Sequence, residues 1–317
     1  MNYNTAVIDI GSNSVRLVIY RVEGRSIWPV FNEKVLAGLG RDLWVTRTLH
    51  PDGMKETLIA LRRFKAILES YKLHKTHVVA TAAIREAGDG PAFVETILQD
   101  TGFLVRTLSG AEEAYYSAQG VHCGHLDAKG VVGDLGGSSL ELINLDGEET
   151  GKGVTLPLGP FALGAPQPID VPKTYATIRE RIEPLRDRFS GGQFHAVGGA
   201  WRNLALIWML KQNYPLHVIQ QFELPAREAL SVCTLIAGQS ATALEKMAGV
   251  PKTPAGKHLV RRPGAARPDR DLPLRVAVLF GLRPARRPAV RFARRRPEAR
   301  RPAHRGLHGA GQAAGHQ

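Results

Sequence analysis

Two short segments rich in glycine and serine have the residue types and spacing to bind a phosphate group. They run from Asp9 to Leu17 and from Asp134 to Leu142, with Asp, Gly, Ser and Leu at matching places. Each joins two apolar runs, which predicts a tight turn between strands. Small residues let backbone N–H groups converge on an anion, and hydroxyls add donors. We predict phosphate contacts from the turn residues Gly11, Ser12, Asn13, Ser14, Gly136, Gly137, Ser138 and Ser139.

Three carboxylates flank these turns. Asp9 and Asp134 end the strands that lead into them, and Glu141 lies just beyond the second turn. A carboxylate beside a phosphate is repelled by it unless a cation lies between them, and Mg²⁺ accepts one or two carboxylates together with substrate oxygens. We therefore expect Asp9, Asp134 and Glu141 to be metal ligands. The alternatives are that each Asp caps its own turn and that Glu141 lies on a solvated strand face.

Two adjacent glutamates open a predicted helix. Glu112 and Glu113 follow Ser109 and Gly110, and Ser109 has the side chain of a helix N-cap. Adjacent helical residues point about 100° apart, so only one of the two is expected to face a ligand. A carboxylate there can act as general base on a water that attacks phosphorus. The alternative is that both only complement the positive end of the helix dipole.

An arginine and a second pair of glycines complete the candidate site. Arg85 follows a run of small residues and has the planar fork that clamps a phosphate, although an exposed arginine without this role is an equal alternative. Gly198 and Gly199 separate an apolar strand from a helix, as at an anion-binding helix start, and Arg202 lies in the next turn. Neither a Walker A loop nor a G-x-G-x-x-G fingerprint occurs.

Alternating strands and helices position these residues. The patterns predict strands at 5–10, 15–20, 27–31, 77–81, 103–108, 130–134, 139–145 and 194–197. Helices are predicted over 54–71, 173–190, 201–211 and 226–248. One further helix is predicted to end near residue 98, and another to begin at about residue 110. This alternation indicates a duplicated α/β protein. We expect one domain over 1–124, a second over 125–250, and a tail over 251–317.

The tail differs from the rest of the chain in charge and composition. It holds 17 Lys and Arg against 3 Asp and Glu, and 9 of the 20 prolines, whereas residues 1–250 have a net charge of −1. Proline at this density breaks helices and sheets, which predicts disorder. Three interpretations stay open: a polyanion-binding arm, a solvated tail and, the one we favour, an out-of-frame C-terminus, because Arg, Ala, Pro and Gly have GC-rich codons.

Bulk composition narrows the class of protein. A chain of 317 residues is long enough for two domains with separate cores. No apolar run is long enough to span a membrane, and the N-terminal residues do not read as a signal peptide. Cys123 and Cys233 are too few for a disulfide framework or a zinc site and suggest two reduced core thiols. We expect a cytoplasmic protein that binds neither a membrane nor a specific nucleic acid.

Five segments resemble motifs of the exopolyphosphatase / guanosine pentaphosphate phosphohydrolase family, in order and spacing. They are IDIGSNSVRL (8–17), ATAAIREA (80–87), LSGAEEA (108–114), GDLGGSSLEL (133–142) and VGGAWR (197–202). The resemblance implies two duplicated actin-like or sugar-kinase-like (ribonuclease H-like) domains with an interdomain cleft. It also implies Mg²⁺-dependent release of terminal phosphate from inorganic polyphosphate or of the 5′ phosphate from guanosine pentaphosphate, and a possible homodimer.

The same resemblance assigns roles to individual residues. It makes Glu113 the catalytic base and Arg85 a phosphate contact, with Asp9, Asp134 and Glu141 positioning metal or water. Two departures stand out: Ser138 replaces the usual third glycine, with Leu140 for the usual Thr, and the tail replaces the family's C-terminal elements, so that the second domain is expected to be incomplete. The remaining alternatives are an actin-like ATPase or sugar kinase, and an inactive product whose tail gathers polyanions.

Overall fold

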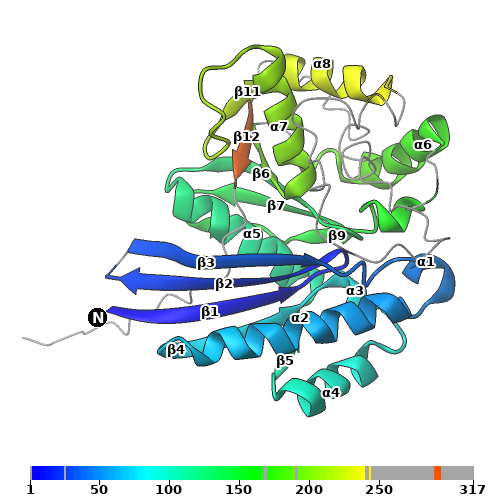
Figure 1. Ribbon diagram of the computed structural model, residues 1–317. Helices are drawn as coiled ribbons and strands as arrows, with labels where there is room; N and C mark the ends of the chain where they lie inside the picture. Colours follow the sequence, from blue (N-terminus) through cyan, green and yellow to red (C-terminus); the bar gives the residue numbers. More distant parts are fainter. Residues whose placement is uncertain are drawn as a thin grey trace, which may run out of the picture.

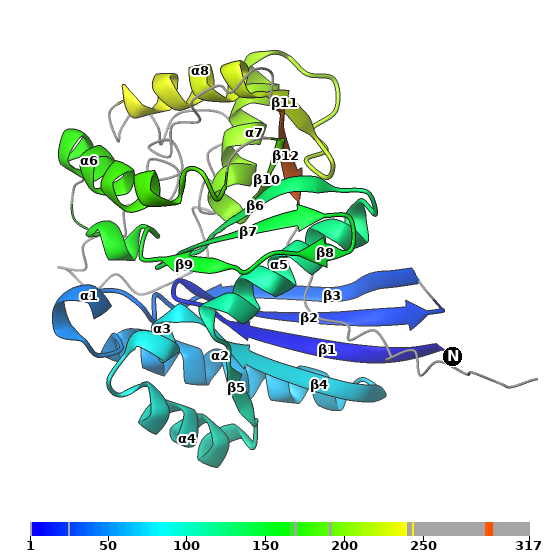
Figure 2. The same ribbon diagram turned by 180° about the vertical axis from the view of Figure 1, so that it is seen from behind.

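The fold is described by a computed structural model of the chain (Figure 1). The described residues are 2–239 without 25, 166, 168–169 and 190–191, together with 243 and 289–293. Two β-sheets lie one above the other in Figures 1 and 2, each with its own helices. No helix among these residues has the length and apolarity that a membrane crossing requires.

The first sheet has the strand order β3-β2-β1-β4-β5. Its strands are β1 (Asn2–Ile10), β2 (Ser14–Glu23), β3 (Ser26–Leu36), β4 (Leu73–Ala80) and β5 (Val105–Thr107). The associated helices are α1 (Leu43–Thr46), α2 (Pro51–Glu69), α3 (Ala82–Glu86) and α4 (Gly90–Thr101). Alternate residues of β1 and helically spaced residues of α2 form one core, among them Ile8, Ile10, Leu61 and Phe64. The sheet is therefore covered on that face by α2 and α4 (Figure 1).

The second sheet repeats this topology. It consists of β6 (Lys129–Leu135), β7 (Leu140–Asp146), β8 (Glu149–Thr150), β9 (Val154–Leu156), β10 (Gln193–Val197), β11 (Glu223–Pro225) and β12 (Ala289–Ala293). The path β9-β7-β6-β10-β12 matches the five-strand order of the first sheet, with β8 and β11 added. The predicted duplicated α/β fold is thus confirmed.

Helices cover both faces of the second sheet. The helices α6 (Val171–Ile182), α7 (Gly199–Lys211) and α8 (Ala226–Ala237) contribute to one core, with Leu135 and Leu142 from the sheet. The opposite face packs against α5 (Gly110–Gly124), through a separate core that includes Ala118 and Val132. The predicted boundary at 124 assigns α5 to the first domain, whereas its core contacts are with the second sheet.

The tail is described only in part. Residues 289–293 form β12, which runs parallel to β10 and antiparallel to β11. Disorder is therefore the wrong prediction for these five residues, because pairing with two strands gives their backbone N–H and C=O groups hydrogen-bond partners. The rest of 251–317 lies outside the described residues, as does most of the helix expected to continue to 248.

The two cysteines differ in environment. Cys233 lies in α8 and is buried, and burial raises the pKa of its thiol to about 12. Cys123, near the end of α5, is exposed. The expectation of two core thiols is therefore right for Cys233 and wrong for Cys123.

Candidate active site

The two Gly/Ser turns have the same backbone geometry. The N–H of Gly11 donates to the carbonyl of Ser14 at 3.0 Å, and the N–H of Gly136 donates to that of Ser139 at 2.9 Å. Each turn lies between the first two strands of its sheet. The sequence repeat is therefore a structural repeat.

Each turn is also held by the chain that follows an edge strand of its sheet, β3 in the first sheet and its counterpart β9 in the second. Four backbone hydrogen bonds do this: Gly38 N to Asn13 O at 3.1 Å, Gly40 N to Ser12 O at 2.7 Å, Gly159 N to Ser138 O at 3.1 Å and Phe161 N to Gly137 O at 2.9 Å. The bonds are equivalent in the two halves. Because they engage the turn carbonyls, they fix the turn conformation without consuming its own N–H donors.

The two turns contact each other across the domains. A Cβ placed on Gly137 would lie 3.1 Å from Cβ of Ser12 and 3.3 Å from N of Asn13. A Cβ on Gly40 would lie 2.9 Å from Cβ of Ser12 and 3.2 Å from Oγ of Ser138. A side chain at either glycine would thus crowd the residues of the opposite turn, and glycine permits this close approach. The predicted phosphate-contacting residues of the two turns are brought together.

Ser138 has the environment of a ligand contact. It is 1 % exposed, and its Oγ has no hydrogen-bond partner within the described part of the chain. A buried hydroxyl without a partner costs free energy unless a ligand or water completes its hydrogen bonds. The departure from glycine at this position therefore adds a donor at the junction of the two turns.

The three predicted metal ligands do not form one cluster. Asp134 and Glu141 face each other directly across β6 and β7, and each is 2 % exposed. Asp9 instead faces Arg16 across β1 and β2. Among the described residues, no group of three His, Cys, Asp or Glu side chains could hold a metal ion. The expected three-carboxylate set is therefore reduced to the pair of Asp134 and Glu141.

This pair fits a cation of the Mg²⁺ type. Two carboxylates directly opposite on neighbouring strands repel each other, and Mg²⁺ is commonly bound by one or two carboxylates plus substrate oxygens. The burial of Glu141 also excludes the alternative that it lies on a solvated strand face.

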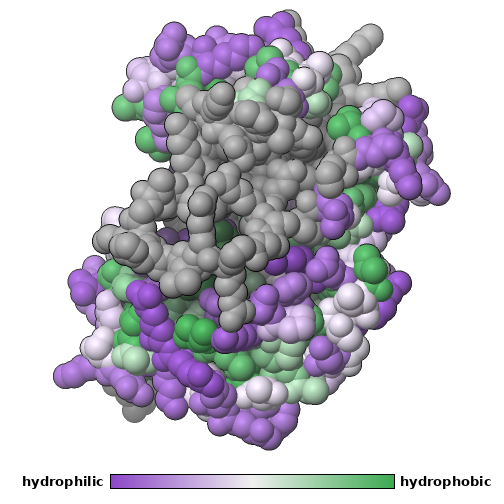
Figure 3. All heavy atoms as spheres, turned by 45° about the vertical axis from the view of Figure 1, so that its right-hand side comes forward, coloured by the Kyte–Doolittle hydropathy of each residue, from purple (hydrophilic) through white to green (hydrophobic). Residues whose placement is uncertain are grey.

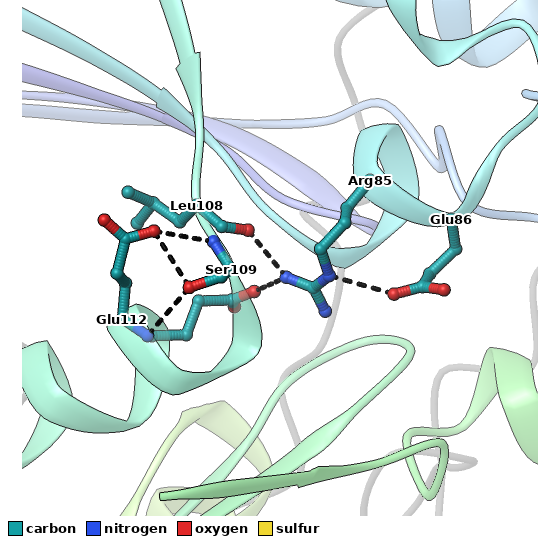
Figure 4. Close-up of polar contacts among 6 residues, drawn as sticks. Arg85, Glu86, Leu108, Ser109 and Glu112 are labelled. Atoms are coloured by element: carbon teal, nitrogen blue, oxygen red, sulfur yellow. Dashed lines mark hydrogen bonds and ion pairs between the residues drawn. The ribbon is translucent and has the colours of Figure 1, made fainter.

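The adjacent glutamates of α5 have different environments. Glu112 completes a capping box: its Oε2 accepts from the N–H of Ser109 at 2.9 Å, and its own N–H donates to Oγ of Ser109 at 3.3 Å (Figure 4). It also pairs with Arg106. The hydrogen bond from the Ser109 backbone lowers the pKa of Glu112. Glu112 thus stabilises the start of the helix.

The side chain of Glu113 points towards Arg85 and not towards the helix cap, and the residue is 3 % exposed. It forms an ion pair with Nη1 of Arg85, which also donates to the carbonyl of Leu108 at 2.9 Å. Nε of Arg85 donates to Oε1 of Glu86 at 2.9 Å (Figure 4). Burial acts to lower the pKa of Arg85, but the carboxylates of Glu113 and Glu86 raise it above its ordinary value. Arg85 is accordingly not a freely exposed arginine, and the structure joins it to Glu113.

The glycine pair begins α7 at the end of β10. Gly198 has φ 119°, and a Cβ on it would lie 2.5 Å from the carbonyl oxygen of Leu135. Since Val197 pairs with Asp134, this helix start lies beside the second turn. Nε of Arg202 donates to the carbonyl of Gly198 at 3.3 Å.

Lys34, which pairs with Arg16 across β2 and β3, was not predicted as a site residue. Desolvation lowers the pKa of Lys34, the guanidinium groups of Arg202 and Arg16 lower it further, and Asp9 opposes them. Lys34 thus lies within electrostatic reach of Asp9 and of arginines from both domains. The signal available in the sequence was that Arg16 occupies, in the first repeat, the place of Glu141 in the second.

The chain is similar to known proteins in sequence and in fold. The model of the Ppx/GppA phosphatase family matches residues 18–266. A solved Ppx/GppA enzyme of Aquifex aeolicus is 20% identical, with a TM-score of 0.72 over 93% of this chain and 96% of that one. An exopolyphosphatase of Cytophaga hutchinsonii is 18% identical, with a TM-score of 0.77 over 92% of this chain and 94% of that one. At these identities, both structures show a shared fold.

One curated relative is similar over part of the chain. The bifunctional 3-dehydroquinate synthase/phosphatase of Fusobacterium nucleatum is 30% identical over 170 residues, which are 50% of this chain and 25% of that protein. The chain thus matches about a quarter of the length of that relative.

Proposed function

This chain belongs to the Ppx/GppA phosphatase family, and on that premise we propose that it is a Mg²⁺-dependent exopolyphosphatase releasing terminal orthophosphate from inorganic polyphosphate. The observation that carries the proposal is the convergence of the two Gly/Ser turns. Their N–H groups and hydroxyls, with Ser138 Oγ among them, suit the oxygens of a terminal phosphoryl group. Polyphosphate supplies such a group at each chain end.

Arg85 and Glu113 carry the hydrolytic step in this proposal. Nη1 and Nε of Arg85 are engaged by protein acceptors, so Nη2 is the atom assigned to a phosphate oxygen. Glu113 orients a water and accepts its proton as the water oxygen bonds to phosphorus. The bridging P–O bond breaks, and the shortened polyphosphate leaves with the bonding electron pair. The products are orthophosphate and a chain one phosphate shorter.

Asp134 and Glu141 are the residues assigned to Mg²⁺. When bound, the cation offsets negative charge on phosphate oxygens. The N–H and hydroxyl donors of the turns also stabilise negative charge on the phosphate oxygens. Because these dipoles are held in place by the fold, they need no reorganisation during the reaction.

The test is phosphate release from long-chain polyphosphate with Mg²⁺, comparing the parent with Glu113→Gln. Loss of a general base lowers turnover by roughly 10²–10⁴-fold. Glu112→Gln is the matched control, since it changes the neighbouring carboxylate and weakens only the capping box and the ion pair with Arg106, away from Arg85. Turnover of Glu113→Gln within about threefold of the parent would remove Glu113 from this role.

The same assay separates the alternative substrates. Release from guanosine pentaphosphate and not from polyphosphate would replace the proposed substrate but keep the site. Turnover that needs ATP and transfers phosphate to a sugar would instead identify a kinase. Binding of polyphosphate without release by the parent would identify an inactive polyanion-binding product.

A further inference from the structure

A serine of α5 connects that helix to one of the buried carboxylates. The hydroxyl of Ser117 donates a short hydrogen bond to Oδ2 of Asp134, and the two residues are 1 % and 2 % exposed. Ser117 lies four residues after Glu113, so both side chains project from one face of the helix. The contact therefore links the element that carries Glu113 to the strand that carries Asp134.

Packing holds the serine in this place. Ala114, Ala118 and Val121 of α5 belong to the same core as Val132 and Ile143 of the second sheet. Small residues at 114 and 118 bring the helix backbone close to the sheet. A serine between them reaches the carboxylate with its short side chain.

We propose that Ser117 is a positioning residue that orients the carboxylate of Asp134 for Mg²⁺, an inference that rests on the proposed function. A carboxylate held by a neighbouring donor has fewer orientations to lose when it binds a cation. Such outer partners of metal ligands typically affect metal affinity or activity by 10–100-fold. Ser117 acts through Asp134 and does not contact the phosphate.

The test measures Mg²⁺ binding directly, by isothermal titration calorimetry of the full chain without substrate. Ser117→Ala is expected to weaken Mg²⁺ binding by roughly 10–100-fold. Ser117→Thr keeps the hydroxyl and is expected to retain most of the parent's affinity for Mg²⁺. In activity assays at saturating Mg²⁺, Ser117→Ala is expected to recover much of the kcat lost at low Mg²⁺, with little change in KM for polyphosphate.

The matched control is Ala118→Gly, which alters the same helix next to Ser117 without touching Asp134. It lowers the melting temperature through packing and helix propensity, and Mg²⁺ affinity is expected to stay at the parent value. If Ser117→Ala does not fold, Ser117→Cys, with similar volume and a weaker donor, serves in the same comparison.

The outcomes separate the two proposals. A parent that binds Mg²⁺ and a Ser117→Ala variant of equal affinity would overturn the role of Ser117 alone. An equal loss of Mg²⁺ affinity in Ala118→Gly would also overturn the role of Ser117, because the loss would then come from helix packing in general. A parent that binds no Mg²⁺ would overturn the metal assignment and this inference together.

Discussion

At the residue scale, two adjacent glutamates have different surroundings. Glu112 accepts hydrogen bonds from Ser109 at the helix start, and Glu113 is buried beside Arg85. The helix rotates consecutive side chains by about 100°, which directs Glu112 to the cap and Glu113 towards Arg85 of α3. The proposed base Glu113 therefore has the guanidinium of Arg85 as its charged partner, in addition to the positive end of the α5 dipole.

Arg85→Lys is expected to lower kcat/KM by about 100-fold, a loss of roughly 3 kcal/mol in transition-state binding. A lysine ammonium cannot reach Glu113, Glu86, the Leu108 carbonyl and a phosphate with the geometry of a guanidinium. Steady-state kinetics on polyphosphate would measure the loss. Glu86→Gln, which alters the exposed end of the same network, is the control and should retain most activity. Full activity of Arg85→Lys would contradict a phosphate-clamping role.

At the element scale, the two glycines at the start of α7 differ in backbone geometry. Gly198 combines positive φ with a close approach to Leu135, whereas Gly199 has only the far end of the Arg202 side chain near its Cβ position. The two residues are adjacent in sequence and begin the same helix. Replacing each one with alanine therefore separates the effect of a strained backbone from the effect of losing a glycine.

Gly198→Ala is expected to destabilise the fold by about 2–3 kcal/mol, because alanine meets both an unfavourable φ and the Leu135 carbonyl. Gly199→Ala should change the stability by less than about 1 kcal/mol, since helix propensity favours alanine there. Urea denaturation followed by circular dichroism would give both values. Equal stability of the two variants would contradict the strained geometry at Gly198.

At the scale of the whole molecule, α5 and β12 join segments that are distant in sequence. The helix α5 packs on the second sheet, while its Glu113 pairs with Arg85 of α3 in the first domain. The strand β12 supplies the partner that β10 and β11 share. On the face shown in Figure 3, hydrophilic side chains predominate on both domains, with apolar ones in smaller patches between them. The ion pair of Glu113 with Arg85 and the pairing of β12 with β10 and β11 connect these distant segments.

Truncation tests the contribution of β12. A chain ending at residue 250 lacks the strand, so β10 and β11 lose their shared partner, and we expect loss of cooperative unfolding or aggregation. A chain ending at 293 keeps the strand and should unfold as the parent does. Thermal unfolding and size-exclusion chromatography would distinguish the two. Identical behaviour of both truncations would contradict a structural role for β12.

The sequence by itself determined the turns, their duplication and the family resemblance. These depend on local features: glycine and serine at fixed spacing, apolar strands around them, and an N-cap serine before the glutamates. Local backbone preference and periodicity are encoded within a few residues, so the α/β fold and the residues of both turns could be predicted. Mg²⁺, the substrate and the role of Glu113 stay predictions.

Only the tertiary structure decided which of these groups meet. It paired Glu113 with Arg85, placed Asp9 opposite Arg16 instead of with Asp134 and Glu141, and brought Ser117 to Asp134. It also placed α5 against the second sheet and part of the tail within it. Such contacts depend on strand register and helix packing between residues far apart in sequence, where no local pattern in a single chain specifies the partner.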